Sequence, residues 1–328
     1  MTEPRPAARR DLIVALGPVD ALVGDILRPF GDVVEAAPDG PSLESHLAHA
    51  IGLIARGTSI VDRQLLDGAP RLRVIGRSGI GFELIDLAAA NARGIPVVVT
   101  PGAGATAVAE GALALILHLV KRLGVLTDLV REGRWSEREA VGVGDLAGAT
   151  LGIVGFGRIG RRLAGFATAL GMRLVVADPW LAPGVAGQEN IERVELDALA
   201  GMADVISLHA PLTPSTFHLI DDAFLARVRP GTILVNCGRG GLLDLDAAHA
   251  ALLDGRLAGV GLDVFDPEPP PAGGHPIFRH PDVVLTPHVL GLSRLGRQRV
   301  FEDMAAGMAA VLGGGRAQHI ANPEIFDR

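Results

Sequence analysis

The chain has 328 residues, of which 48% are hydrophobic, and its formal net charge is −7. This length suits about two domains. A negative charge without a long basic run argues against nucleic acid or an anionic membrane surface as the main partner. Cys237 is the single cysteine, which excludes an intrachain disulfide and a cysteine metal cluster. No histidine spacing typical of a metal site stands out, so we expect no metal.

The N-terminus carries no pattern of export or membrane anchoring. The apolar run at residues 12–16 is short, and Gly17, Pro18 and Asp20 break it, unlike the core of a signal peptide. No stretch approaches the roughly 18 uninterrupted apolar residues of a membrane-spanning helix. We therefore expect a soluble cytoplasmic protein.

The first third of the chain alternates between strand and helix patterns, which predicts a parallel sheet with helices on both faces. Ligands of such sheets bind outside the carboxyl ends of the strands, where Arg56 and the loop from Arg77 to Gly81 fall. The predicted strands are residues 11–16, 33–34, 51–55, 72–75 and 97–99, and the predicted helices run from Pro18 toward Phe30, from a Ser42 cap through His49, and over 60–66 and 86–93.

A hinge candidate at residues 100–102 interrupts this alternation. A long apolar helix is predicted over about 106–123, and a second helical piece over 125–132 leads to Trp135. A second alternating unit then begins at Ala149. Its later strands are predicted at 205–208, 232–235, 259–262 and 283–285, with helices at 221–227 and 244–253, and a last helix at 293–312 follows a second hinge candidate at 287–291.

The two hinge candidates predict a discontinuous first domain. We expect a substrate domain formed by residues 1–101 and 290–328, with a cofactor domain, residues 102–289, inserted into it. A cleft between the domains is the expected place for the substrate. The helix at 106–123 is apolar nearly all round, so we expect it to be a buried hinge helix or part of a subunit interface.

The stretch LGIVGFGRIG at residues 151–160 has the features of a dinucleotide-binding turn. An apolar strand meets Gly155, Gly157 and Gly160, a helical pattern follows at 161–170, and a second strand ends in Asp178. The glycines permit the tight turn, the approach of a pyrophosphate and close helix–strand packing, and the helix N-terminus offers N–H groups to phosphate. Arg158 and Ile159, inside the turn, are further expected cofactor contacts.

Asp178 lies 23 residues after Gly155, where a carboxylate can accept hydrogen bonds from the adenosine ribose hydroxyls. Its charge would repel a 2′-phosphate, and no arginine directly follows it, so the expected cofactor is NAD.

Three polar groups follow later strands of the predicted cofactor domain, in the stretches at 235–241, 261–269 and 285–291. His288 can serve as the acid–base, because imidazole titrates near neutral pH. Glu268 can bind the other ring nitrogen and raise the imidazole pKa. Arg239 can bind a carboxylate while it polarises a carbonyl group. Together these groups suit hydride transfer by a nicotinamide enzyme.

The segments GIVGFGRIG, NCGRGGLLD, GLDVFDPEPP, HPIF and LTPHVLG, in this order, resemble the D-isomer-specific 2-hydroxyacid dehydrogenase family over most of residues 50–312. The resemblance implies a Rossmann-type cofactor domain inserted into a flavodoxin-like substrate domain, a homodimer joined through the cofactor domains, and a catalytic triad of Arg239, Glu268 and His288. It also implies that Asp263 contacts the nicotinamide carboxamide. The further cofactor contacts that it implies are His209, Pro211, Thr216, Cys237, Gly238 and Gly291.

Within this family the chain is most similar to phosphoglycerate dehydrogenases. Arg56 and Arg77, 21 residues apart in GLIARGTS and VIGRSGIG, match a pair of arginines that would suit the second anion of a phosphorylated hydroxy acid. The backbone N–H groups of Ser78, Gly79 and Ile80, through Gly81, would hold the carboxylate. The loops at 81–86 and 104–110 depart from the family's usual pattern, and we expect no regulatory domain after residue 312.

The expected activity is NAD-dependent interconversion of a D-2-hydroxy acid and its 2-oxo acid, with 3-phosphoglycerate as a candidate substrate. In oxidation His288 would accept the hydroxyl proton while C2 gives its hydride to the nicotinamide. Glyoxylate or hydroxypyruvate reduction by the same triad is an alternative. A non-enzymatic alternative is an NADH-binding corepressor, which would use the same fold as a partner-binding switch.

Overall fold

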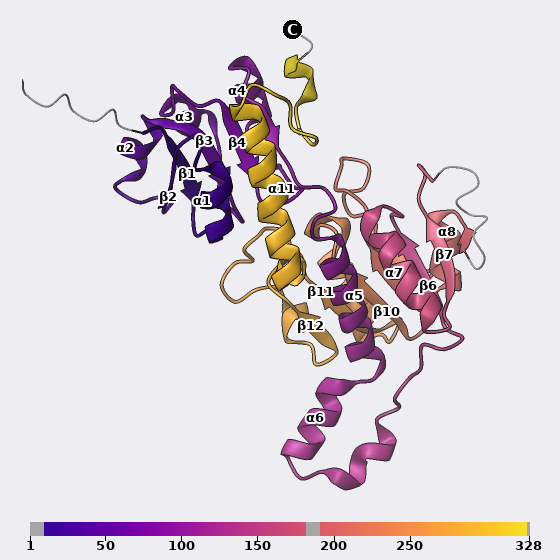
Figure 1. The fold of residues 1–328 in the computed structure, drawn as a ribbon. Helices are drawn as coiled ribbons and strands as arrows, with labels where there is room; N and C mark the ends of the chain where they lie inside the picture. The colour runs from indigo at the N-terminus through magenta and orange to yellow at the C-terminus, as the bar shows by residue number, and fades with distance from the viewer. Residues whose placement is uncertain (1–9, 182–190, 327–328) are drawn as a thin grey trace, which may run out of the picture. The chain divides into compact units, whose positions relative to one another are not determined.

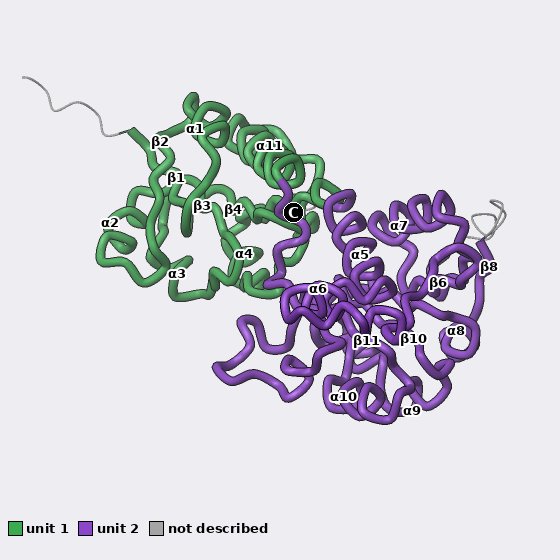
Figure 2. The backbone as a smooth tube through the Cα atoms, turned by 90° about the horizontal axis from the view of Figure 1, so that it is seen from below, with its two compact units in different colours: residues 1–104, 294–328 green, residues 105–293 purple. Residues whose placement is uncertain are grey.

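The computed structural model describes residues 10–181 and 191–326 and divides the chain into two compact units. Unit 1 comprises Met1–Gly104 and Arg294–Arg328, and unit 2 comprises Ala105–Ser293 (Figure 2). The first segment of unit 1 ends three residues after the predicted domain boundary at residue 101. Unit 2 ends four residues after the predicted boundary at residue 289. Within the described ranges no helix is both long enough and apolar enough to cross a membrane.

Unit 1 is built on a five-stranded parallel sheet, as the alternating pattern predicts. The strand order β2-β1-β3-β4-β5 is that of flavodoxin-like folds. The strands are β1 (Leu12–Leu16), β2 (Asp32–Ala36), β3 (Ala50–Ala55), β4 (Val74–Arg77) and β5 (Val97–Val98) (Figure 1).

Helices cover both faces of this sheet because successive strand residues point to opposite sides. Ile13 and Val74 pack with α1 (Ala21–Leu27) and α11 (Arg294–Leu312), whereas Val14 and Ile75 belong to the core on the other face. Gly76 lets α11 approach β4, since a Cβ there would lie 2.3 Å from the sulfur of Met308. The second face is covered by α2 (Leu43–Leu47), α3 (Arg63–Asp67) and α4 (Leu87–Ala92).

Aspartates begin three of these helices, and for α4 this start at Asp86 is the predicted one. The carboxylates of Asp20, Asp62 and Asp86 accept backbone N–H groups of the first turns of α1, α3 and α4. Consequently α1 starts after Asp20 rather than at Pro18, and α3 starts later than the expected residue 60. Ser42 is the N-cap residue of α2, as predicted, but its side chain makes no capping hydrogen bond, and the helix ends at Leu47 rather than at His49.

Unit 2 holds a seven-stranded parallel sheet in the order β12-β11-β10-β9-β6-β7-β8. Six of these strands in this order form the Rossmann arrangement, in which the strand order reverses between β6 and β9. The strands are β6 (Thr150–Val154), β7 (Arg173–Ala177), β8 (Ile191–Arg193), β9 (Val205–Leu208), β10 (Thr232–Asn236), β11 (Leu257–Leu262) and β12 (Val283–Leu285). The predicted fold class is thereby confirmed in both units.

The long apolar helix is largely buried inside unit 2. It is α5 (Ala105–Val120), which packs against α7 (Arg158–Ala169) and against β10 and β11 (Figure 1). Gly259 permits this contact, since a Cβ there would lie 2.9 Å from Leu119. The opposite face of the sheet is covered by α8 (Leu196–Met202), α9 (Asp222–Leu225) and α10 (Leu245–Leu253). The packing shows that the helix is buried, and its expected role as a hinge or in a subunit interface stays a prediction.

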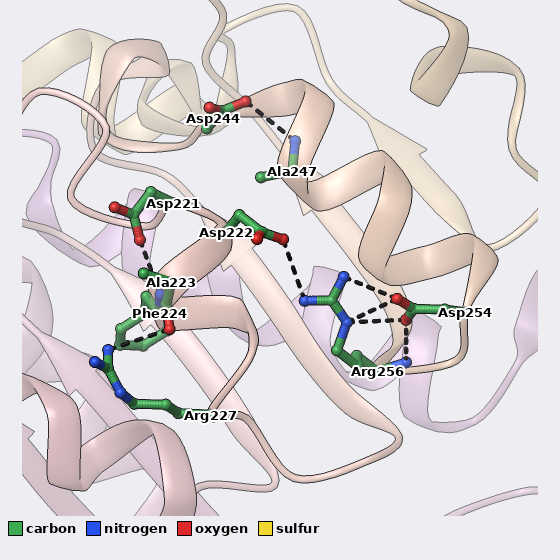
Figure 3. A network of polar contacts seen from close by, with 9 residues as sticks. All are labelled: Asp221, Asp222, Ala223, Phe224, Arg227, Asp244, Ala247, Asp254 and Arg256. Carbon is green, nitrogen blue, oxygen red and sulfur yellow. Dashed lines mark hydrogen bonds and ion pairs between the residues drawn. The ribbon is translucent and has the colours of Figure 1, made fainter.

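Polar contacts cap α9 and α10 and join both helices to Arg256, the residue before β11 (Figure 3). Asp221 accepts the N–H of Phe224 at 2.8 Å, and Asp244 accepts the N–H of Ala247 at 3.1 Å, so each aspartate caps the helix that follows it. Arg256, just before β11, bonds to Asp254 and reaches Asp222 of α9. Arg256 thereby links α9 and the end of α10 to the start of β11.

Candidate active site and cofactor site

The glycine turn between β6 and α7 is forced by close backbone contacts. Gly155 has φ = +91°, and a Cβ there would lie 2.6 Å from the amide nitrogen of Ala210. A Cβ on Gly160 would lie 2.4 Å from the carbonyl oxygen of Gly155. Only glycine satisfies both positions, since a side chain would collide with backbone atoms that cannot move aside.

The N-terminus of α7 has the chemistry of a phosphate site. The first turn contains no acidic residue. Among residues 10–181 and 191–326, no side chain caps the helix at Gly157, and no atom outside the local backbone lies within 4 Å of where a Gly157 Cβ would be. No described side chain therefore caps the N–H groups of the first turn, which lie at the positive end of a 12-residue helix. These features fit the pyrophosphate of a dinucleotide, which Arg158 and Ile159, the first helical residues, would adjoin.

Asp178 follows β7 and braces the glycine turn. One of its oxygens accepts the N–H of Phe156 at 2.7 Å, and the other accepts the N–H of Trp180 at 2.9 Å. Sequence reasoning missed these two contacts. A carboxylate has about four acceptor positions, so two remain to receive ribose hydroxyls. The predicted role in ribose binding therefore stays a prediction that is compatible with this bracing role.

The loop after β9 lines the other side of the turn. His209 Nε2 lies 2.9 Å from Ser207 Oγ, and burial lowers the pKa of His209 to about 4, so the ring is neutral. Its buried Nδ1 has no hydrogen-bond partner in the described part of the chain. Thr216 Oγ1 donates to the Pro211 carbonyl at 2.7 Å and accepts the N–H of Thr213, also at 2.7 Å, which shapes the rest of the loop.

Arg239 is placed by the loop after β10. Asn236 donates to the Arg239 carbonyl at 2.9 Å and accepts the N–H of Gly238 at 3.0 Å. A Cβ on Gly240 would lie 2.0 Å from the backbone carbon of Phe265, so this loop touches the one after β11. Sequence reasoning did not single out Asn236 or Gly240, although both lie in the quoted motif around Arg239.

Glu268 and His288 are hydrogen-bonded, as the sequence predicts. Glu268 Oε2 lies 2.7 Å from His288 Nδ1, and Glu268 Oε1 accepts the N–H of Phe265 at 2.9 Å. His288 has φ = +51°, a backbone conformation that few side chains adopt, which is consistent with a constrained functional position. Its side chain remains 51% exposed.

The three charged groups act on one another. The hydrogen bond that His288 donates to Glu268 raises the pKa of His288, while burial and the charge of Arg239 oppose this shift. Burial alone would raise the pKa of Glu268, but the hydrogen bonds from His288 and Phe265, with the charges of His288 and Arg239, leave it below its usual value. Glu268 is thus a carboxylate at neutral pH, and His288 Nδ1–H donates to it.

Asp263, at the end of β11, is 2% exposed and holds the His288 loop. It accepts the Thr286 hydroxyl at 2.6 Å, the N–H of Val289 at 3.0 Å and the N–H of Leu290 at 3.4 Å. Burial raises the pKa of Asp263, although these hydrogen bonds oppose the rise. The residues that Asp263 binds flank His288 in the chain, so Asp263 positions the imidazole. Its predicted contact with the carboxamide stays a prediction.

Cys237 and the two remaining glycines lie around these loops. Cys237 is buried, and burial together with the charge of Asp263 raises the pKa of its thiol, so it is not a nucleophile. A Cβ on Gly238 would lie 2.9 Å from Leu242, and one on Gly291 would lie 3.4 Å from Val108. Gly238 therefore has the stricter packing requirement of the two.

The predicted substrate residues occupy strand ends in unit 1. Arg77 donates to the carbonyls of Gly81 at 2.7 Å and Gly57 at 2.8 Å, so it joins the loops after β3 and β4. The amides of Ser78 and Gly79 donate to the carbonyls of Ala55 and Arg77. The prediction that this loop binds a carboxylate through its amides therefore depends on Ile80, which is 52% exposed, and on Gly81.

The strand order of the two sheets, the glycine turn and the Glu268–His288 pair belong together in one class of protein. This class is the two-unit α/β oxidoreductases that bind a dinucleotide. A family model described as "D-isomer specific 2-hydroxyacid dehydrogenase, NAD binding domain" matches residues 113–289. The chain belongs to the D-isomer specific 2-hydroxyacid dehydrogenase family, and this part of it is an NAD-binding domain.

Named relatives agree with this assignment. D-3-phosphoglycerate dehydrogenase of Mycobacterium tuberculosis (strain H37Rv) is 38% identical over 299 residues, which cover 90% of this chain but 56% of that protein. Glyoxylate reductase of Thermococcus litoralis is 36% identical over 299 residues, which cover 89% of each chain. The crystal structure of D-lactate dehydrogenase from Aquifex aeolicus, complexed with NAD and lactic acid, matches with a TM-score of 0.82 and 28% identity, covering 93% of this chain and 96% of that one. The chain thus spans about half the length of its phosphoglycerate dehydrogenase relatives.

Proposed function

We propose that the protein interconverts a D-2-hydroxy acid and its 2-oxo acid with NAD as the redox partner. The observation that carries this proposal is the Glu268–His288 hydrogen bond at 2.7 Å. The positive charge of Arg239 acts on the pKa of both residues of this pair. An acid–base, the carboxylate that orients it and a cation for the substrate are the groups that this reaction requires. When bound, NAD supplies or accepts the hydride.

His288 moves the proton in this proposal. Because Glu268 binds Nδ1, the other ring nitrogen, Nε2, is the atom that exchanges a proton with the substrate oxygen. In reduction the imidazolium gives its Nε2 proton to the carbonyl oxygen, and in oxidation the neutral ring accepts the hydroxyl proton. Glu268 favours the imidazolium form, since it raises the pKa of His288.

Arg239 binds the substrate carboxylate and stabilises negative charge that develops on the reacting oxygen. Its planar guanidinium suits two parallel hydrogen bonds to a carboxylate. The Asn236 contacts and the close approach at Gly240 hold its loop in place. We expect the NAD-binding residues to be the glycine turn, Asp178 and the loop after β9.

The candidate substrate is 3-phosphoglycerate, in the oxidising direction. Its support is the similarity to D-3-phosphoglycerate dehydrogenases together with the arginines at the strand ends of unit 1. Glyoxylate or hydroxypyruvate reduction is a second candidate, favoured by the glyoxylate reductase relative that the chain matches over 89% of both lengths.

Steady-state NADH oxidation with phosphohydroxypyruvate, hydroxypyruvate and glyoxylate side by side tests the proposal. We expect turnover with at least one of these acids, and a loss of roughly 100-fold or more in His288→Gln, since positioned acid–base groups contribute about 10² to 10⁴-fold. His249→Gln, on α10, is the matched control. Absence of turnover with all three acids would count against an enzyme and favour the NADH-binding corepressor alternative.

We also propose a cytoplasmic homodimer that forms through unit 2. Its support is an arm of this unit, made of α6 (Leu123–Arg131) and η1 (Trp135–Ala140), which extends from the rest of unit 2 (Figure 1). The arm exposes Val130 by 63% and Trp135 by 62%. Apolar side chains exposed on a projecting segment favour contact with a second copy.

A further inference from the structure

The hydroxyl and both backbone groups of Thr286, the residue directly after β12, are hydrogen-bonded within unit 2. The hydroxyl donates to Asp263 Oδ1 at 2.6 Å. The N–H donates to the carbonyl of Leu262 at 2.9 Å, and the carbonyl accepts the N–H of His288 at 3.0 Å. Thr286 is therefore fixed to the end of β11, and it in turn holds the backbone of His288.

The turn between Thr286 and His288 is tight and needs support. Its hydrogen bond encloses only Pro287, and His288 has φ = +51°. A side chain in this left-handed region persists only where surrounding contacts hold it. One oxygen of Asp263, Oδ1, binds both the Thr286 hydroxyl before the turn and the N–H of Val289 after it. Removal of the hydroxyl would leave this oxygen bonded on one side of His288 only.

The same hydroxyl favours the charged form of Asp263. Burial raises the pKa of Asp263, and the hydrogen bond from Thr286 is the strongest influence that lowers it, ahead of the N–H of Val289 and the charge of His288. Donors stabilise an ionised carboxylate, because charge-assisted hydrogen bonds are the stronger ones. The charge of Asp263 in turn raises the pKa of His288. Thr286 thus acts on the imidazole through Asp263.

The other titratable groups that act on His288 and Asp263 belong to the loops after β10 and β11. Glu268 raises the pKa of His288, and Arg239 lowers it. Burial and the charge of Asp263 raise the pKa of the Cys237 thiol, which is therefore neutral at physiological pH. A substitution at Thr286 leaves these side chains in the protein, so its effect on His288 passes through Asp263 or through the turn.

We propose that Thr286 is a positioning residue for the proton transfer at His288: its hydroxyl keeps Asp263 charged and bound to the backbone around the imidazole, and its carbonyl fixes the turn. Only the proton transfer itself rests on the proposed function, since the effect of Thr286 on the imidazole needs no substrate.

Three variants separate this role from a structural one. Thr286→Val keeps the β-branched shape but removes the hydroxyl, whereas Thr286→Ser keeps the hydroxyl. Thr232→Val is the matched control. Thr232 is 1% exposed, and its hydroxyl donates to the Arg229 carbonyl at 2.7 Å. It lies at the start of β10, at the amino ends of the strands, whereas the candidate site lies at their carboxyl ends.

The first test is the pH profile of kcat/KM for reduction of a 2-oxo acid. Reduction needs the imidazolium, and without the hydroxyl Asp263 loses charge more easily, so the decline with rising pH should begin at lower pH in Thr286→Val. At neutral pH we expect kcat/KM to fall by roughly tenfold or more, as loss of a hydrogen bond to a charged group predicts. Thr286→Ser and Thr232→Val should keep the wild-type profile. An unchanged profile in Thr286→Val, or the same change in Thr286→Ser, would overturn the role of the hydroxyl.

A second test needs no turnover. NMR of protein labelled with ¹³C-histidine follows the imidazole directly, and His288→Gln identifies the signal of His288 by its loss. The pKa of His288 should be lower in Thr286→Val than in wild type, Thr286→Ser and Thr232→Val. An equal pKa in all four proteins would overturn the proposal, even if the wild type reduces a 2-oxo acid. A lowered pKa without reduction of any 2-oxo acid would support the role of Thr286 and contradict the proposed function.

Discussion

At the scale of single residues, the candidate active site depends on a carboxylate that changes the titration of an imidazole. One oxygen of Glu268 accepts the N–H of Phe265, and the other accepts a hydrogen bond from His288. The first contact fixes the carboxylate, and the second fixes which ring nitrogen is available to the substrate. Asp263 then holds the backbone on the far side of His288. The imidazole is therefore oriented from two directions by buried or half-buried acids.

Replacement of Glu268 by Gln should shift the pH dependence of both reaction directions. The pKa of His288 is raised in the folded protein, chiefly by Glu268, so reduction requires pH values below that raised pKa. In Glu268→Gln the pKa falls, and the decline of kcat/KM for reduction should begin at lower pH, with activity at neutral pH down roughly 100-fold. Oxidation should gain its neutral base at lower pH as well.

The measurement is the pH profile of kcat/KM in both directions. Glu44→Gln, an exposed acid on α2, serves as the control and should reproduce the wild-type profile. Identical profiles for Glu268→Gln and wild type would mean that Glu268 does not set the protonation of His288.

Replacement of Asp178 by Ala should reduce the preference for NAD over NADP. The carboxylate would repel a 2′-phosphate, and such like-charge contacts cost on the order of several kcal/mol, so the ratio of kcat/KM for the two cofactors should narrow by roughly tenfold or more. Because Asp178 also accepts the amides of Phe156 and Trp180, the variant should have a lower Tm. An unchanged cofactor ratio would refute the ribose assignment, whatever happens to the Tm.

At the scale of elements, the site is a set of three loops that follow neighbouring strands. Because β10, β11 and β12 are adjacent and parallel, their carboxyl ends lie at one edge of the sheet. Arg239, Glu268 and His288 come from these three loops in turn. Gly240 allows the first two loops to touch, and the Asp263–Thr286 hydrogen bond joins the second to the third.

Replacement of Gly240 by Ala should separate the loops after β10 and β11. The new Cβ would lie 2.0 Å from the backbone of Phe265, which cannot yield as a flexible side chain can. We expect kcat/KM to fall by about 100-fold, since a displacement of about 1 Å can cost that much in catalysis. Gly165→Ala on α7, where no atom lies within 4 Å of the new Cβ, should keep its activity and gain up to about 1 kcal/mol in stability.

At the scale of the whole molecule, the two units share one type of architecture but differ in size. Each is a parallel sheet with helices on both faces, and each places its candidate functional residues after the carboxyl ends of strands. Unit 1 is completed by the last long helix, α11, which returns to it after all of unit 2. Arg297 and Phe301 of α11 reach Arg56 at the end of β3 in this way.

The proposed dimer should depend on the exposed arm of unit 2. In sedimentation at micromolar concentration we expect the wild type to be a dimer and Trp135→Asp to shift toward monomer, with the Kd raised by roughly tenfold or more because buried aromatic anchors dominate interfaces. Leu253→Asp, which alters a side chain 69% exposed on α10, should remain dimeric. A monomeric wild type, or a dimeric Trp135→Asp, would argue against an interface at this arm.

The sequence by itself determined the fold class and the identity of the Glu268–His288 pair. These features follow from hydrophobic periodicity, from glycines with unavoidable backbone contacts, and from short segments whose residues are close in the chain. Only the tertiary structure decided what depends on distant segments: the contact of Gly240 with Phe265, the bracing of the glycine turn by Asp178, and the gathering of Arg56 and Arg297 on Phe301. Arg56 and Arg297 are 241 positions apart, and no local pattern encodes which side chains a returning helix brings to a strand end.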